Sequence, residues 1–395
     1  MIHETPPPQS AEYLDAVRAI LPGIRERAPS IDQIGRIPEA TVRDLDEVGV
    51  FRALQPRQWG GLELDPGTFF ESVALIASAC GSTGWVAGVV AVHPWEVALL
   101  SDRAQREVWG ESTRTRLSSS YAPTGKVRPV AGGFELSGQW RFSSGVDLCD
   151  WAILGGVPEG ETEADISAFL VRRADFAVDA DSWKVAGLAG TGSKTINVES
   201  AFVPEYRRHK IADVNRGNIP GWEVNDRPLY HLPWMAGIFT YAIAAPAIGA
   251  ATGALEAYIE QTRTRVGAYG GPPVAASPAV QVRLANALAE VENARMRMGS
   301  TWDEFYGLAC SGARLIPAEL QARCRYEGPR AITKCLHSVL EVFEVAGGSV
   351  MQLSNPIQRY LRDLLAMRNH PMGALESNAA TYARAVLNAS QGESK

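Results

Sequence analysis

The periodicity of apolar and polar residues changes twice along the 395 residues of this sequence, and these changes limit the fold more than any other feature. Residues 1–116 carry helical patterns, residues 117–212 consist of short alternating runs separated by turn residues, and residues 213–395 return to helical periodicity. Helices and strands segregated in this way are typical of an α+β protein and not of a βαβ fold. We predict an N-terminal helical domain, a central antiparallel β-domain and a C-terminal helical bundle, with those bounds.

Local signals support the N-terminal helices. Pro38 stands where a helix begins, and Gly49 stands where a left-handed residue ends it. A further helix is predicted over residues 66–79. The glycines of GSTG, residues 81–84, predict a break before another apolar helix near Trp85.

The central part is predicted to form a small antiparallel sheet or barrel. Gly132 and Gly133, within VRPVAGGFELSGQWRF, indicate a hairpin turn. WAILGGV, AFLVRR and KTINVESAFV are typical of further strands. The Gly-rich segment GLAGTGS, residues 187–193, matches neither GxGxxG nor GxxxxGK[ST], so we interpret it as a turn and not as a phosphate loop.

Apolar residues spaced four and three apart predict two long bundle helices, over residues 284–305 and 332–346. Gly328 and Pro329 predict an interruption before the second of them. The first stripe consists of the apolar residues Leu284, Leu288, Val291, Met298, Trp302 and Phe305, together with Arg295 at the same spacing.

Composition excludes several classes of protein. Lys and Arg number 38 against 44 Asp and Glu, a net charge of −6, so the broad basic surface that nucleic acid requires is missing. The five cysteines are scattered and form no CxxC pair, which argues against a disulfide framework and a thiolate metal site. We therefore expect no metal, no nucleic-acid partner and a reducing, cytoplasmic location.

Two uncharged runs, residues 72–95 and 231–255, are long enough to cross a bilayer. Both are rich in Ala, Gly, Ser and Thr and are interrupted by His and Pro, which makes insertion unfavourable. We predict helices that are buried against other helices, and no membrane partner.

Six stretches, in this order and spacing, carry a resemblance to a known family. They are LQPRQWGGL (54–62), CGSTGWV (80–86), SSSYAP (118–123), GQWRFSSG (138–145), GLAGTGS (187–193) and NPIQRYLRD (355–363). With these stretches the sequence resembles the acyl-CoA dehydrogenase superfamily. Within it, the sequence resembles the oxygenase components of two-component flavin-dependent monooxygenases, including hydroxylases of a steroid-derived phenol.

The resemblance implies an acyl-CoA dehydrogenase-like fold with a C-terminal four-helix bundle, assembled as a homotetramer, with flavin between the β-domain and the bundle. It also implies the cofactor and the partner. Reduced FMN, or FADH2, would arrive from a separate NAD(P)H-dependent flavin reductase and react with O2 to a C4a-hydroperoxide. One oxygen atom would then pass to a phenolic or polycyclic aromatic substrate.

The resemblance assigns the catalytic roles to Ser144 and His370. A flavin hydroperoxide is short-lived in water, so its site must be dry and must offer a hydrogen bond near flavin N5, which the Ser144 hydroxyl would supply. A phenol is a better nucleophile once deprotonated, and His370 would take its proton as a base. Without the resemblance, the serine pair before Gly145 indicates only a turn, and His370 indicates a helix end.

The resemblance also implies contacts to the cofactor and the substrate. His93 and Trp95 would line the substrate pocket, with core packing as the alternative for these side chains. An anionic flavin phosphate needs arginine or exposed backbone N–H groups, which Arg263 or Arg265 and a glycine pair would provide. The predicted cofactor contacts are Trp85, Tyr121, Trp140, Phe142, Ser143, Arg263, Gly347, Gly348, Ser354 and Asn355.

Two other functions stay open at this point. One is an acyl-CoA dehydrogenase-type FAD oxidoreductase, but in such enzymes the segment after the Arg-Asp pair typically supplies a glutamate base. Here that place holds His370 and Pro371, and Glu376 is the nearest carboxylate. The other is a non-catalytic scaffold that kept the fold and lost its flavin.

Overall fold

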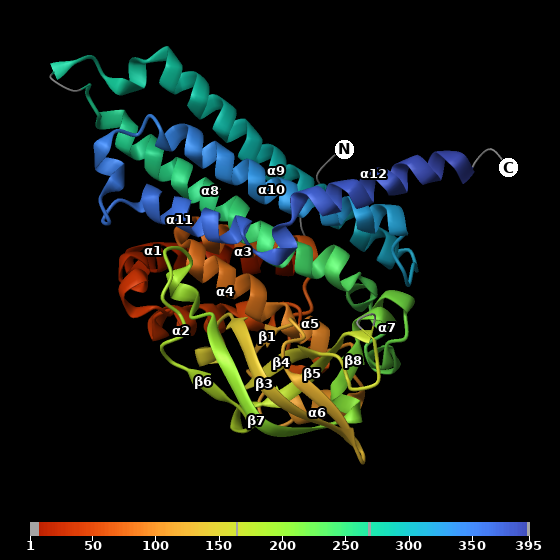
Figure 1. Ribbon diagram of the computed structural model, residues 1–395. Coiled ribbons are helices and arrows are strands. Elements are labelled where there is room, and N and C mark those ends of the chain that lie inside the picture. The colour runs from red at the N-terminus through yellow and green to blue at the C-terminus, as the bar shows by residue number, and fades with distance from the viewer. Residues whose placement is uncertain (1–7, 163–164, 268–269, 393–395) are drawn as a thin grey trace.

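The computed structural model describes residues 8–162, 165–267 and 270–392. Its elements follow the predicted order of helices, then strands, then helices. Figure 1 shows the strands gathered at one end of the molecule and the long bundle helices at the other, with α3 (Pro66–Ala79) and α4 (Gly81–Ala91) between them. We propose residues 1–116, 117–212 and 213–395 as the three domains of the chain.

The first part of the described chain is helical, as predicted. Pro38 and Gly49 flank α2, and Gly49 has a φ of 89°. Asp65 caps α3, because its carboxylate accepts the backbone N–H of Thr68. Besides α3 and α4, the helices are α1 (Pro8–Ile34), α2 (Glu39–Val48), α5 (His93–Val97) and α6 (Asp102–Trp109).

The break predicted at residues 81–84 is wrong. Helix α4 begins at Gly81, and only Cys80, in an extended conformation, separates it from α3. A Cβ atom on Gly84 would lie 2.3 Å from the Cβ of Ala77. This glycine therefore allows α4 to pack closely on α3, and it does not mark a turn.

The central part forms two four-stranded sheets, with strand orders β1-β4-β5-β8 and β2-β3-β7-β6. The predicted turn at Gly132 joins β2 to β3, and the pairings are antiparallel except for β1 beside β4, which is parallel. The strands are β1 (Leu117–Ser120), β2 (Lys126–Val130), β3 (Gly133–Ser143), β4 (Trp151–Gly156), β5 (Ser167–Arg172), β6 (Ala177–Asp179), β7 (Lys194–Pro204) and β8 (Arg208–Lys210).

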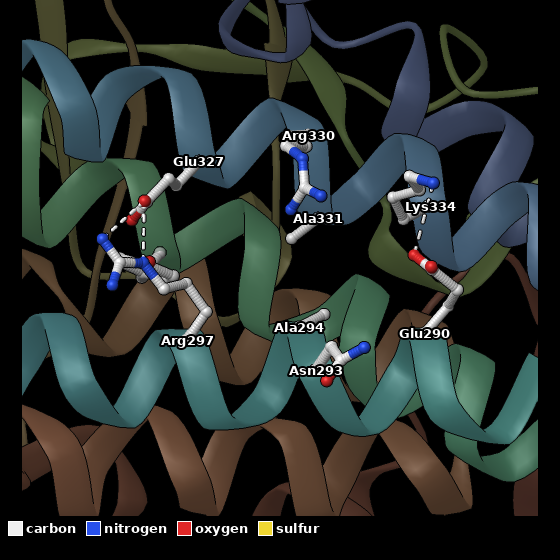
Figure 2. Close-up of a pocket in the computed structure, with 9 residues that line it drawn as sticks. Glu290, Asn293, Ala294, Arg297, Glu327, Arg330, Ala331 and Lys334 are labelled. Carbon is white, nitrogen blue, oxygen red and sulfur yellow. Dashed lines mark hydrogen bonds and ion pairs between the residues drawn. The ribbon is translucent and has the colours of Figure 1, made fainter.

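The C-terminal part is a helical bundle built around α8, which packs against α3, α4, α9, α10 and α11. Ion pairs join α9 to α10, with Arg297 to Glu327 at 2.7 Å and Lys334 to Glu290 at 3.3 Å (Figure 2). The helices are α7 (Ile211–Arg216), α8 (Phe239–Thr264), α9 (Pro278–Cys310), α10 (Ala318–Phe343), α11 (Pro356–Arg368) and α12 (Leu375–Gly392).

Two details of the predicted bundle are wrong. Helix α10 runs without interruption through Gly328 and Pro329. A Cβ on Gly328 would lie 2.3 Å from the methyl carbon of Thr240, so close packing on α8 explains this glycine. In α9, Leu288 does not belong to the buried stripe, because 43% of it is exposed.

Both uncharged runs lie inside the protein. Residues 72–95 are divided among α3, α4 and α5 and are almost entirely buried. Among the described residues, one helical segment, Trp234–Thr264, is apolar and long enough to span a membrane. Within its most apolar window, 94% of the residues are buried, as in a core helix.

Candidate active site

The turn after β3 carries Ser144 and lies against α4. Phe142 and Gly145 both adopt positive φ values, 64° and 69°. A Cβ on Gly145 would lie 2.9 Å from the side chain of Val90, so the turn and the helix are in close contact. This contact brings Ser144 to Trp85, whose indole Nε1–H donates to the serine Oγ at 3.1 Å.

Ser144 heads a chain of hydroxyl groups. Its Oγ lies 2.7 Å from the Oγ of Ser193, which lies 2.7 Å from the Oγ1 of Thr191. Thr191 donates its single hydrogen to the carbonyl of Leu188 at 2.8 Å. Because each hydroxyl has one hydrogen, Ser193 must donate to Thr191, and Ser144 must donate to Ser193. Ser144 Oγ, which also accepts from Trp85, therefore keeps one lone pair for a further donor.

The segment GLAGTGS is thus a turn, as predicted, and it also supplies two site residues that were not predicted, Thr191 and Ser193. Their hydroxyls within a Gly-rich turn are the only signal for them in the sequence. The turn is fixed to the bundle by Asp363 of α11, whose carboxylate accepts the Leu188 backbone N–H at 2.6 Å. Burial raises the pKa of Asp363 to about 7.

His370 follows α11 and reaches the same place. Its ring packs edge-on against Trp85, with 5.5 Å between ring centroids. Its Nδ1 accepts the backbone N–H of Met372 at 3.2 Å. Burial lowers the pKa of His370 to about 4, so the ring is neutral at pH 7 and carries its proton on Nε2. Trp85 thus contacts both Ser144 and His370.

Tyr121 lies in a second aromatic cluster with His93. The Tyr121 hydroxyl donates to the carboxylate of Glu96, and its ring packs edge-on against Trp234 and Phe239. His93 Nδ1 lies 3.4 Å from both Glu96 Oε2 and the Tyr121 hydroxyl. Glu96 was not predicted, although it is the only Asp, Glu, Lys or Arg between residues 72 and 100. A lone charge in such a run is the signal that could have identified it.

Two predicted site residues lie in hydrophobic cores. Trp140 is fully buried between the two sheets, and its Nε1–H donates to the Gly155 carbonyl at 2.8 Å. Trp95 is fully buried among helices, and its Nε1–H donates to the Leu229 carbonyl at 2.7 Å. The N–H groups of both indoles donate to backbone carbonyls and are therefore not free to bind a cofactor or a substrate.

Phe142 and Ser143 lie between Trp140 and Ser144 in the sequence and differ in exposure. Phe142 is 69% exposed and packs edge-on against Trp183 at 6.1 Å. Ser143 is fully buried, and its hydroxyl has no partner among the described residues. A buried hydroxyl without a partner marks a place where a bound group or a water molecule completes the hydrogen bonding.

The predicted phosphate contacts lie at the other end of α11. Arg263 points outward and pairs with Glu260, whereas Arg265 donates to the backbone carbonyls of Val345 and Ala346. Asn355 caps α11 and is separated from His370 by the whole helix of 13 residues, about 20 Å. Gly347, Gly348 and Ser354, the other predicted phosphate contacts, precede Asn355 in the sequence. Within one chain the structure therefore does not bring the predicted phosphate contacts to Ser144.

Comparison with known proteins agrees with the fold. The family model described as acyl-CoA dehydrogenase, C-terminal domain, matches residues 241–373. The oxygenase subunit HsaA of a flavin-dependent monooxygenase from Rhodococcus jostii (strain RHA1) is 42% identical over 355 residues, covering 89% of this chain and 92% of that protein. The oxygenase component of FADH(2)-dependent resorcinol hydroxylase from Rhizobium sp. (strain MTP-10005) is 32% identical, covering 94% and 93%.

Among solved structures, the HsaA monooxygenase from M. tuberculosis superposes with a TM-score of 0.90 at 38% identity, covering 96% of this chain and 97% of that one. The fold predicted from the resemblance is thereby confirmed. The chain belongs to the oxygenase components of flavin-dependent monooxygenases, within the acyl-CoA dehydrogenase superfamily.

Proposed function

We propose that this chain hydroxylates a phenolic or polycyclic aromatic compound, with Ser144 and His370 as its catalytic residues. The observation that carries the proposal is the contact of Trp85 with both of them. Residues far apart in the sequence, from the turn after β3 and from the segment after α11, thus both contact Trp85 of α4.

The groups around Trp85 fit a reduced flavin ring, which carries N–H donors and no charge on most of its surface. Ser144 offers a free lone pair, and Ser143 offers a buried hydroxyl without a partner in the described structure. We propose that these two serines, Trp85 and Phe142 hold the ring and keep water away from it. When bound, reduced FMN or FADH2 supplies the electrons that activate O2 for transfer of one oxygen atom.

The geometry revises the role proposed for His370. Its Nδ1 is occupied by the Met372 N–H and its pKa is low, so the ring donates from Nε2 and does not readily hold a proton at pH 7. A donor of this kind stabilises the oxygen of a phenol that has lost its proton. Tyr121, which the resemblance assigns to the flavin, lies beside His93, and we propose that both contact the same substrate from the second aromatic cluster.

The phosphate end of the flavin needs a different contact. Because α11 separates Asn355 from His370 by about 20 Å, we propose that the loop of residues 347–355 serves a flavin held by another copy, within a homotetramer. Met351 and Leu353 in this loop are 69% and 81% exposed in the single chain, as expected for an interface. Light scattering of the purified protein tests the tetramer.

We propose that the partner of this chain is a separate flavin reductase that depends on NAD(P)H. We also propose that this chain is located in the cytoplasm. The five cysteines are free in the structure, which agrees with a reducing compartment.

The test supplies chemically reduced FMN or FADH2 with O2 and a panel of phenols, and measures hydroxylated product and hydrogen peroxide. We expect product from at least one phenol. Hydrogen peroxide alone across the panel would contradict the proposal. The dehydrogenase alternative predicts bleaching of bound FAD by an acyl-CoA, and it lacks a buried base at Glu376, whose side chain is 84% exposed. Failure to bind either flavin would favour a scaffold.

A further inference from the structure

Glu96 is a buried carboxylate that the proposed reaction has not yet used. Only 1% of it is exposed, and three groups donate to it or lie beside it. His209 Nε2 lies 2.7 Å from Oε1, while the Tyr121 hydroxyl donates to Oε2 and His93 Nδ1 lies 3.4 Å from Oε2. A buried carboxylate is costly unless it is paired in this way, so its presence in an apolar helix calls for a function.

The electrostatics keep Glu96 ionised. Burial alone would raise its pKa, but hydrogen bonds from His209 and His93 lower the pKa to about 2. Three titratable groups face Glu96: His93 from α5, Tyr121 from the residue after β1, and His209 from β8. Trp234 and Phe239 pack against the rings of Tyr121 and His209, and neither of them titrates.

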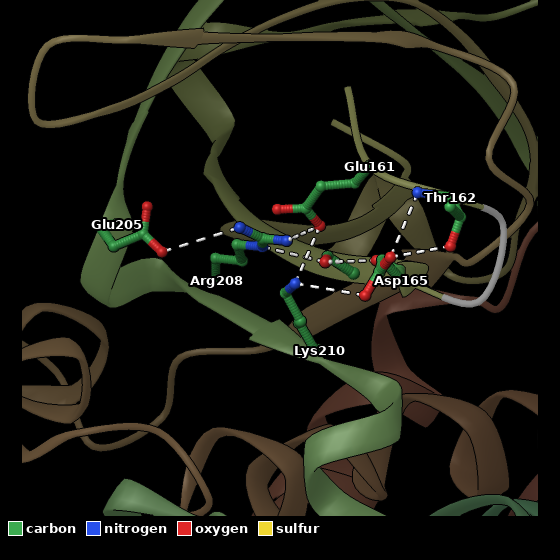
Figure 3. Close-up of polar contacts among 7 residues, drawn as sticks. Glu161, Thr162, Asp165, Glu205, Arg208 and Lys210 are labelled. Carbon is green, nitrogen blue, oxygen red and sulfur yellow. Dashed lines mark hydrogen bonds and ion pairs between the residues drawn. The ribbon is translucent and has the colours of Figure 1, made fainter. Parts of the chain in front are cut away.

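His209 is held in place by the two residues beside it. Side chains alternate along a strand, so Arg208 and Lys210 point away from the face that carries His209. Both flanking residues pair with Glu161, at 2.5 and 3.1 Å, and Lys210 also pairs with Asp165 at 3.3 Å (Figure 3). These outer ion pairs fix β8 and so fix the distance from His209 to Glu96.

The cluster is also incomplete in a way that points to a ligand. His209 Nδ1 and Trp234 Nε1 are buried and have no hydrogen-bond partner among the described residues. When the His93 proton sits on Nδ1, toward Glu96, His93 Nε2 carries a lone pair that can accept a hydrogen bond.

We propose that Glu96 and His209 are positioning residues that make His93 the acceptor of the substrate's phenolic proton, an inference that rests on the proposed function. The phenol O–H bond breaks, and the proton and His93 Nε2 form a new N–H bond, leaving a phenolate beside an imidazolium. Ionised Glu96 balances the imidazolium charge, and Tyr121 and His209 hold the carboxylate in its orientation. The site thereby selects aromatic substrates that carry an ionisable hydroxyl.

The test uses the full-length protein without flavin and 4-nitrophenol as the probe, because the coloured phenolate reports ionisation directly by absorbance. In the wild type we expect bound 4-nitrophenol to ionise at a lower pH than free 4-nitrophenol. In Glu96→Gln the midpoint for bound phenol should rise by about one pH unit, a tenfold change, because the imidazolium loses its counter-charge. Glu327→Gln removes a carboxylate paired with Arg297 between α9 and α10, and it should leave the midpoint unchanged.

A second pair of variants separates positioning from folding. His209→Gln keeps an N–H donor toward Glu96 and should retain a midpoint close to the wild type, whereas His209→Ala should raise it. In turnover with reduced flavin, Glu96→Gln should lower kcat by about 10- to 100-fold below neutral pH while KM changes little.

An unchanged midpoint in Glu96→Gln, or a wild type that binds no phenolate, would overturn the proposal. If the wild type shows the midpoint shift but hydroxylates no phenol, the proposed function fails and the positioning pair stands. If the wild type hydroxylates phenols and Glu96→Gln behaves identically at every pH, the positioning pair fails and the function stands.

Discussion

The hydroxyl chain from Ser144 to Leu188 gives the sharpest prediction, because its direction sets which form of flavin the site prefers. The Ser144 hydroxyl donates its hydrogen to Ser193 Oγ, so towards any further group it can act only as a hydrogen-bond acceptor. Reduced flavin has an N–H at N5, whereas oxidised flavin has a lone pair there. The wild-type site should therefore favour the reduced form.

Replacing Thr191 with Val removes the acceptor that fixes this direction. Ser193 can then turn its hydrogen to Ser144, and Ser144 becomes free to donate. The Leu188 carbonyl still accepts from the indole of Trp183 at 3.3 Å, so the substitution does not orphan it. One neutral hydrogen bond contributes about 1 kcal/mol, which corresponds to about a fivefold change in the dissociation constant.

We expect Thr191→Val to bind oxidised flavin about fivefold more tightly, with little change for reduced flavin. Fluorescence titration measures the oxidised form, and anaerobic titration measures the reduced form. Thr333→Val serves as the control, because Thr333 also donates to a backbone carbonyl, that of Pro329, but lies in α10. Equal weakening of both forms, or an unchanged ratio of the two dissociation constants, would refute the reasoning.

Further predictions concern coupling, pH and the alternative base. Ser144→Ala should keep O2 consumption but shift its product to hydrogen peroxide, measured as the ratio of peroxide to hydroxylated phenol. His370→Ala should lower product formation by about 100-fold without weakening flavin binding, and an unchanged rate would remove His370 from the site. The pKa of Asp363 is raised from 3.8 to about 7, so the folded state binds an extra proton between these values and stability should fall as pH rises from 4 to 7. Asp363→Asn should flatten that slope in urea titrations, and a slope equal to the wild type would contradict this assignment. Glu376→Gln should leave hydroxylation unchanged, because the carboxylate is exposed.

The sequence predicted the helical, β and helical order because periodicity changes with element type, and capping residues such as Pro38 and Gly49 act locally. The interpretation of two glycines was wrong. Gly84 and Gly328 were interpreted as breaks, although both make room for a neighbouring helix, and only tertiary contacts distinguish these two roles.

The candidate site was predicted only in part, for a similar reason. Ser144, Trp85 and His370 do meet, but the direction of hydrogen bonding at His370 depends on the backbone N–H of Met372, which periodicity does not reveal. Trp140 lies within one of the six stretches and Trp95 lies outside them, and the indole N–H groups of both donate to backbone carbonyls in hydrophobic cores. Glu96 and His209 meet across more than 100 residues and required the fold to bring them together.

A structure determined under anaerobic conditions with reduced flavin and a bound phenol tests the central claim most directly. We predict the Ser144 hydroxyl at about 3 Å from flavin N5, with the phenol oxygen in hydrogen-bond contact with His370 Nε2 and His93 Nε2. A flavin ring bound away from Trp85, or a phenol that contacts neither histidine, would contradict the account.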